Sequence, residues 1–310
     1  MASAEGRSQL AAITHAGVIS LSPFVPALGP VGGSLNRPPL ALCQDLDRDA
    51  DGVCMASVEP IDLDGGSSDP DGDLLARTLS PASPFGLGDH GVSLGVSDPV
   101  GASATCQARV RVVDRTSPSI AWSAPIVVGT DPGRCSAGPN IVAPTVEDNC
   151  GATVESTRGD GENLTARFLL GTTQIDWQAK DGSGLSASCA QTVRVEDREA
   201  PTIGNLRTDR AEIWPPNHTM ANVTVSYDVL DNCVAHVCSL SVTSNEPENG
   251  LGDGATSPDW KIVDEHHVKL RAERSGNGSG RLYTIGVTCT DRAGLASSLS
   301  TTVNVPKNRK

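Results

Sequence analysis

The chain has 310 residues, a net charge of −13 at pH 7, an isoelectric point of about 4.8 and only 3% aromatic residues. Its negative charge argues against a nucleic-acid partner, because phosphates would be repelled. The sequence has no apolar run of 18 residues that would span a membrane as a helix. The 32 glycines and 21 prolines indicate many turns between short strands.

Residues 1–38 are rich in Gly, Pro and Ser, and we expect a flexible leader or linker without a core of its own. The first residues carry one Arg, and His15 and serines interrupt the apolar stretch, so they do not form a convincing signal peptide. We therefore expect that an export signal upstream is missing from this chain.

The segment "DLDRDADG" is the first candidate calcium site. Its four aspartates alternate with other residues, which is the DxDxDG spacing of a calcium loop: Asp45, Asp47, Asp49 and Asp51. On a tight loop closed by Gly52, alternate carboxylates would converge on one point. No Glu stands at the twelfth loop position, and the alternative is an acidic turn between two strands.

A second candidate calcium site is "SSDPDGDLL", with Asp69, Asp71 and Asp73. It is similar to the acidic turns of secreted adhesion repeats that in some cases hold calcium. The alternative is a turn made for backbone reasons alone, because Asp, Pro and Gly all favour turns. Calcium is the only cofactor that the sequence indicates. The linker residues Asp114 and Asp197 are further candidates by analogy with calcium-bound cadherin joints.

A strand–turn–strand pattern occurs three times. Asp98 and Asp181 each precede a cysteine by eight residues, and Asp291 precedes Leu299 by eight. Apolar residues alternate with polar ones before and after each aspartate, a period typical of an antiparallel sheet with one wet face. We expect the three aspartates to cap backbone amides of their own turns. The sequence thus predicts an all-β chain of three tandem immunoglobulin-like or fibronectin-III-like antiparallel β-sandwiches.

The segments "DRTSPSI" and "DREAPTI" place Pro118 and Pro201 between copies of this pattern. Proline stiffens a joint and stops a strand from simply continuing. We therefore predict sandwiches over residues 39–116, 117–199 and 200–310, within the size range of immunoglobulin-like domains.

The motifs "DPGRCSAG", "TVEDNCGATV" and "LLGTTQIDWQAKDGSGLSASCAQTVRVED" resemble those of the hyalin-repeat (HYR) family. The first sandwich looks like a variant, and the third, with "IWPPNHTM", is similar to modules that close secreted bacterial proteins with such repeats. The resemblance covers nearly everything after residue 39. It implies immunoglobulin-like, extracellular, non-catalytic modules of a bacterial secreted type that serve adhesion or protein interaction.

The nine cysteines fit disulfides in an oxidising compartment, and the odd count leaves at least one thiol without a partner in the chain. Strand positions in an immunoglobulin-like sandwich favour Cys43–Cys106, with Cys54 left over. Cys238–Cys289 is favoured over Cys233–Cys289. The second sandwich stays open between Cys135–Cys150 and a pair with Cys189. Family members often carry a cysteine at the position of Trp122, so this set is incomplete.

No catalytic residue is predicted, because the sequence has no motif that places a nucleophile, a base and a metal together. The adjacent His266 and His267 would point to opposite faces of a strand, so surface positions are expected for the histidines. The expected function is a non-catalytic extracellular structural or adhesion protein whose partner is an extracellular protein or glycan. The alternative is a set of non-catalytic C-terminal accessory modules of a larger secreted enzyme, stabilised by calcium.

Overall fold

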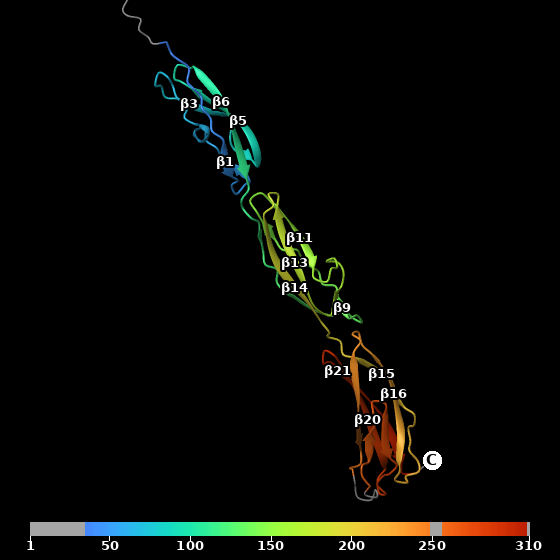
Figure 1. Cartoon of the computed structure of the whole chain (residues 1–310). Coiled ribbons are helices and arrows are strands. Elements are labelled where there is room, and N and C mark those ends of the chain that lie inside the picture. The colour runs from blue at the N-terminus through green and yellow to red at the C-terminus, as the bar shows by residue number, and fades with distance from the viewer. Residues whose placement is uncertain (1–34, 249–255, 309–310) are drawn as a thin grey trace, which may run out of the picture. The chain divides into compact units, whose positions relative to one another are not determined.

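A computed structural model describes residues 35–248 and 256–308 of the chain, and its regular secondary structure is almost entirely β-strand (Figure 1). The described residues include no α-helix, only one 3-10 turn, η1 (Pro60–Leu63). The predicted all-β class of tandem immunoglobulin-like sandwiches is confirmed by these strands and their pairing. Residues 1–34 of the expected leader lie outside the described part.

Contacts between Cα atoms divide the described chain into two compact units. One contains residues 35–44, Pro60–Ala82 and Val92–Ala108, and the other contains Asp45–Glu59, Ser83–Gly91 and the described part of Arg109–Lys310. This division does not follow the boundaries expected near residues 117 and 200, and the three-domain division stays a prediction.

The first four-stranded sheet has the order β1-β6-β5-β3. The strands near the N-terminus are β1 (Leu46–Asp49), β2 (Met55–Ala56), β3 (Ala76–Ser80), β4 (Phe85–Gly86), β5 (Gly88–Ser97) and β6 (Ser103–Val113). Strand β1 runs parallel to β6, with Leu46 opposite Val110, while β3 and β5 are antiparallel. Strands β2 and β4 form a separate antiparallel pair.

A second four-stranded sheet has the order β11-β13-β14-β8. The strands between residues 119 and 196 are β7 (Ser119–Ile120), β8 (Ile126–Gly129), β9 (Ser136–Ala137), β10 (Val146–Glu147), β11 (Ala152–Arg158), β12 (Phe168–Leu169), β13 (Gly171–Asp181) and β14 (Ser186–Glu196). Alternate residues of β13 and β14, such as Ile175 and Val193, meet Phe168 of β12 in one buried cluster. Strand β8 is parallel to β14, as β1 is parallel to β6 in the first sheet.

The C-terminal strands form two sheets, β15-β16-β19-β18 and β17-β20-β21. Their bounds are β15 (Thr202–Thr208), β16 (Met220–Leu230), β17 (His236–Ser244), β18 (Trp260–Ile262), β19 (His267–Arg271), β20 (Gly280–Asp291) and β21 (Ala296–Pro306). Val223 and Leu270 from one sheet share a buried cluster with Tyr283 and Val303 from the other. This shared core makes the region a β-sandwich.

The period-two pattern places most inward residues correctly. Val92, Leu94 and Val96 in β5 are at most 1% exposed, and Val303 and Val305 in β21 are fully buried. Leu299, which the pattern places on the same face, is 42% exposed. It lies three residues from the start of β21, in a stretch of mostly exposed positions beside the hairpin turn, where the packed core does not cover the strand.

Asp64 is a buried side chain whose charge contributes to stability. Burial alone would raise its pKa, but amide and hydroxyl hydrogen bonds from Ser67, the Arg77 guanidinium and the Gly66 amide outweigh burial and lower the pKa to about 2. Because the folded pKa lies below the unfolded value, this stabilisation is present above about pH 4 and is lost as the pH falls toward 2.

We expect Asp64→Asn to lower the free energy of unfolding by about 2 kcal/mol at pH 7 and to have little effect near pH 2. Urea denaturation of both proteins at several pH values measures this difference. Asp73→Asn, in the same region without such partners, is the matched control and should change little at either pH. A D64N deficit that stays constant down to pH 2 would contradict the assigned role of the charge.

Candidate metal centre

Asp114 directly follows strand β6 and turns one carboxylate oxygen back onto its own segment. Its Oδ1 accepts a hydrogen bond from the Thr116 amide at 3.0 Å. The residue is only 8% exposed, and its Oδ2 is buried without a hydrogen-bond partner. A buried carboxylate oxygen without a partner is costly, so it marks a position where a ligand would be stabilising.

Asp148 and Asp181 are held in the same way. Asp148 Oδ2 accepts from the Cys150 amide at 2.8 Å, and its Oδ1 is buried without a partner. Asp181 ends β13, and its Oδ1 accepts from the amides of Ser183 at 2.8 Å and Leu185 at 2.9 Å. Asp181 is 6% exposed, and its Oδ2 is also buried without a partner.

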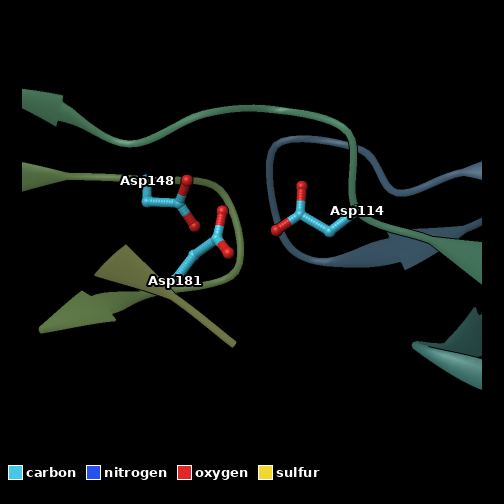
Figure 2. Close-up of side chains that lie close together, drawn as sticks. All are labelled: Asp114, Asp148 and Asp181. Carbon is cyan, nitrogen blue, oxygen red and sulfur yellow. The ribbon is translucent and has the colours of Figure 1, made fainter. Parts of the chain in front are cut away.

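The three carboxylates form an aspartate cluster, Asp114, Asp148 and Asp181, in which one oxygen of each lies within 4.8 Å of the others. Figure 2 shows the three side chains pointing toward a common space from three separate segments. Within the described part of the chain, no other three His, Cys, Asp or Glu side chains are grouped this closely. All three belong to the same compact unit.

The cluster carries concentrated negative charge. Two unit charges 4.8 Å apart repel by about 3 kcal/mol at an effective dielectric constant of about 20. None of the three aspartates forms an ion pair with Lys, Arg or His among residues 35–248 and 256–308. Three carboxylate oxygens without nitrogen or sulfur donors are a ligand set suited to a hard cation such as Ca²⁺.

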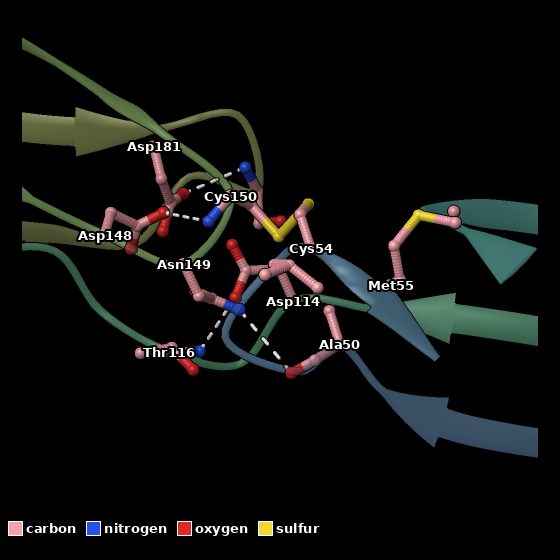
Figure 3. The surroundings of a disulfide bond; sticks show 12 residues. Ala50, Cys54, Met55, Asp114, Thr116, Asp148, Asn149, Cys150 and Asp181 are labelled. Atoms are coloured by element: carbon pink, nitrogen blue, oxygen red, sulfur yellow. Dashed lines mark hydrogen bonds between the residues drawn. A yellow bond between two sulfur atoms is a disulfide. The ribbon is translucent and has the colours of Figure 1, made fainter. Parts of the chain in front are cut away.

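A disulfide and an asparagine hold the cluster's surroundings together (Figure 3). Cys150, two residues after Asp148, is bonded to Cys54. Asn149 Nδ2 donates to the Asp51 carbonyl at 3.1 Å and to the Ala50 carbonyl at 3.5 Å. The Asn149 Oδ1 is buried without a hydrogen-bond partner, which makes it a further candidate oxygen ligand for a metal ion next to Asp148.

The first predicted calcium segment does not form the expected loop. Residues Leu46–Asp49 are strand β1, and an extended strand spaces alternate carboxylates along one face instead of converging them. Asp45 Oδ1 accepts from the Arg109 amide at 2.7 Å, and Asp49 pairs with Arg115 at 2.9 Å. Asp47 is exposed, and Asp51 caps the amides of Val53 and Met55.

The second predicted segment forms a backbone turn. Asp69 Oδ1 accepts from the Asp71 amide at 2.7 Å, as the alternative interpretation requires. Asp71 binds the Arg37 amide at 2.8 Å and its guanidinium at 2.9 Å, and these contacts lower the pKa of Asp71. Asp73 is half-buried. Arg37, expected in a leader, is therefore tied to this turn.

The three turn aspartates make amide contacts in their own turns. Asp98 Oδ1 accepts from Val100, Gly101 and Ala102, and Asp291 Oδ1 accepts from Leu295 at 2.8 Å. Asp98 differs from Asp181 in its second oxygen, because Asn36 Nδ2 donates to Asp98 Oδ2 at 2.8 Å. The Asn36 amide and the turn amides hold the pKa of Asp98 below its usual value.

Four disulfides are present among the described residues. Cys43–Cys106 and Cys238–Cys289 are the two pairs that the sequence analysis favours. The expectation of an unpaired Cys54 is wrong, since Cys54 bonds to Cys150, and Cys135 bonds to Cys233. Both options for the second sandwich are wrong for the same reason: its cysteines pair across the expected boundaries.

Cys189 is the free cysteine, and it is half-buried. Its Sγ lies 3.6 Å from the Ala121 carbonyl oxygen, next to the Trp122 position where the resemblance leads one to expect a cysteine. Cys189 is thus the one cysteine of the nine that lies outside the four disulfides.

A buried network of charged side chains in the C-terminal sandwich was not predicted from the sequence. Arg281, Asp259 and Glu273 are fully buried, and Arg281 contacts both carboxylates. Burial raises the pKa of Tyr283, which lies beside Arg281, to about 12. Arg281 stands two residues before Tyr283, at an inward position of β20, so strand period alone would have flagged it. His218 contacts Glu273 at 3.2 Å, while His267 is exposed.

Part of the chain is similar to a known domain family. Residues 113–195 match the HYR domain family. This HYR segment contains all three residues of the aspartate cluster. The bacterial origin that the resemblance implies is not shown by these matches.

Two of the similar proteins are hyalins. The chain is 30% identical over 178 residues to hyalin of Strongylocentrotus purpuratus, which covers 54% of this chain and 14% of the relative. It is 27% identical over 199 residues to hyalin of Lytechinus variegatus, covering 60% of this chain and 37% of the relative. The matched region is thus well under half the length of either relative.

Similar solved structures include a protocadherin gamma B2 ectodomain segment, at 13% identity and a TM-score of 0.34, covering 88% of this chain and 79% of that one. A segment of three immunoglobulin domains of titin matches at 10% identity and a TM-score of 0.33, covering 87% and 99%. The fold assignment rests on strand order and register, not on these scores. No helix in the described residues is long and apolar enough to cross a membrane.

Proposed function

We propose that the chain is a non-catalytic extracellular structural protein whose HYR-like modules mediate adhesion by binding a protein or a glycan. The observation that carries this proposal is the HYR match over residues 113–195, in a chain that also holds four disulfides. Disulfides persist in oxidising compartments such as the cell exterior. The hyalin relatives support the same assignment.

The arrangement of charged groups supports a role without catalysis. The charged side chains of Arg281, Asp259 and Glu273 are fully buried, and Arg281 pairs with both carboxylates, so a substrate has no access to them. The group of side chains that brings Asp114, Asp148 and Asp181 together contains no His or Cys.

Counting thiols tests the extracellular assignment. Protein taken from the cells that produce it, alkylated with a maleimide polymer under denaturing conditions, should gain one polymer per chain, at Cys189. A protein of a reducing compartment would gain nine, because all nine cysteines would be thiols. Nine additions would contradict the proposal.

Binding to arrays of glycans and extracellular proteins tests the adhesive role. We expect saturable binding that is lost when the disulfides are reduced, since reduction unfolds small disulfide-bonded domains. The reduced and alkylated chain is the matched control. Absence of binding to both arrays, or turnover of a substrate in a hydrolase panel, would overturn the assignment.

A further inference from the structure

We propose that the aspartate cluster, Asp114, Asp148 and Asp181, binds one divalent cation of the calcium class. Each of the three carboxylates has one oxygen fixed by amides of its own turn and one buried oxygen without any partner. The unpartnered oxygens belong to a group whose ligand atoms lie within 4.8 Å of one another (Figure 2). A cation between them would neutralise the repulsion and satisfy all three.

Burial separates this cluster from an ordinary acidic surface. Asp114 and Asp181 are each more than nine-tenths buried, so bulk water does not solvate their free oxygens as it would on an exposed strand. The structure keeps these carboxylates oriented through backbone donors, which leaves their inward oxygens available. Preorganised, dehydrated oxygen ligands of this kind are what a hard cation requires.

The repeat within the chain gives an internal comparison. Asp98 occupies the same hairpin position as Asp181 and caps its turn in the same way. Its second oxygen, however, accepts a hydrogen bond from Asn36, whereas the second oxygen of Asp181 is buried without a hydrogen-bond partner in a residue grouped with two further carboxylates. The hairpin therefore does not by itself require an unsatisfied oxygen, and the cluster supplies a ligand position that the first hairpin lacks.

The donor set selects the chemical class of the ion. All the candidate ligand atoms are oxygens: those of the three carboxylates and the buried Asn149 Oδ1 beside Asp148. Water molecules would complete the coordination shell of the ion. Calcium takes six to eight oxygen ligands in flexible geometry, while zinc prefers nitrogen and sulfur. We therefore assign the site to calcium before magnesium, which demands a stricter octahedron, and before zinc.

A corresponding set, Asp197, Asp231 and Asp291, recurs later in the chain. Asp231 and Asp291 each have a buried Oδ2 without a partner, and Asp197 and Asp231 are 34 residues apart, as Asp114 and Asp148 are. The three are not grouped within the distance that defines the first cluster. The proposal is therefore confined to Asp114, Asp148 and Asp181.

Titration of the full chain with CaCl2 after chelator treatment, by calorimetry and by thermal melting, tests the site. We expect one calcium per chain and a melting temperature that rises with calcium concentration, because the ion binds the folded state. Magnesium should bind more weakly, and zinc should not compete at equal concentration. No heat and no melting shift at millimolar calcium would overturn the proposal.

Asp181→Asn locates the ion, because asparagine keeps the Oδ1 acceptor for the turn amides and removes the charge. Removing a residue that only hydrogen-bonds to a metal ligand lowers metal affinity about tenfold or more, and removing a ligand itself should cost at least as much. We therefore expect the calcium affinity of D181N to fall more than about tenfold. Asp98→Asn makes the same change in the corresponding turn and should leave affinity unchanged. Asp148→Asn, at a less buried position, repeats the test if D181N does not fold.

Two further outcomes decide against the cluster. Undiminished calcium binding in both D181N and D148N would show that the ion binds elsewhere. Loss of binding in an Asp47→Asn, Asp49→Asn double variant, with D181N unaffected, would assign calcium to the β1 segment instead.

Discussion

Replacing Arg281 by methionine should lower the free energy of unfolding of the C-terminal sandwich by about 3–5 kcal/mol. Arg281 is fully buried and contacts the buried carboxylates of Asp259 and Glu273, with Glu246 at 3.3 Å. Methionine would fill the space of the side-chain stem but leave these carboxylates without their counter-charge. Removing one charged residue from a buried ion network is strongly destabilising because it leaves buried charges without a partner. Replacing the whole network with apolar residues would cost far less.

Hydrogen exchange of β20 amides in the full chain measures this effect within the sandwich itself. Arg109→Met is the matched control, because Arg109 is more than half exposed and its carboxylate contacts, at 3.8 and 3.9 Å, are long. Exposed pairs of this kind contribute about 0–1 kcal/mol. Equal effects of R281M and R109M would show that the buried network is not important for stability.

Removal of the Cys238–Cys289 disulfide by a double substitution to alanine should destabilise the same sandwich by about 2–4 kcal/mol. The two cysteines lie opposite each other on the paired strands β17 and β20, and Cys289 is fully buried. The bridge closes a sequence separation of 51 residues, which restricts the unfolded chain.

Urea denaturation of the full chain, with hydrogen exchange of β17 peptides as the local readout, measures the loss. Cys189→Ala is the matched control, because it also removes a sulfur but from a cysteine without a disulfide. We expect it to change stability much less. A double variant as stable as the control would mean that strand pairing alone holds β17 and β20 together.

Strand positions were predictable because their signal is local. The alternation of Val92, Leu94 and Val96 along β5 correctly identifies the inward face, since side chains of a strand alternate between two faces. Arg281 lies on the same inward phase as Tyr283, so its burial followed from the pattern too. The burial of Arg281 was not predicted because arginine is usually found at the protein surface.

The candidate metal centre was much less predictable. The regular DxDxDG spacing drew attention to Asp47 and its neighbours, but hydrogen bonding to β6 keeps that segment extended. Asp114, Asp148 and Asp181 are 34 and 33 residues apart, and no spacing rule joins them. Their turn motifs were recognisable one at a time, and only the folded chain brings their carboxylates together.

The sequence by itself determined the all-β class, the inward face of most strands and the aspartates at hairpin turns, because each depends on residues a few positions apart. The tertiary structure alone decided that Cys54 bonds to Cys150, that Cys189 has no partner, and that three distant carboxylates share one buried space. These outcomes depend on which separate segments lie side by side after folding, and local alternation carries no information about that.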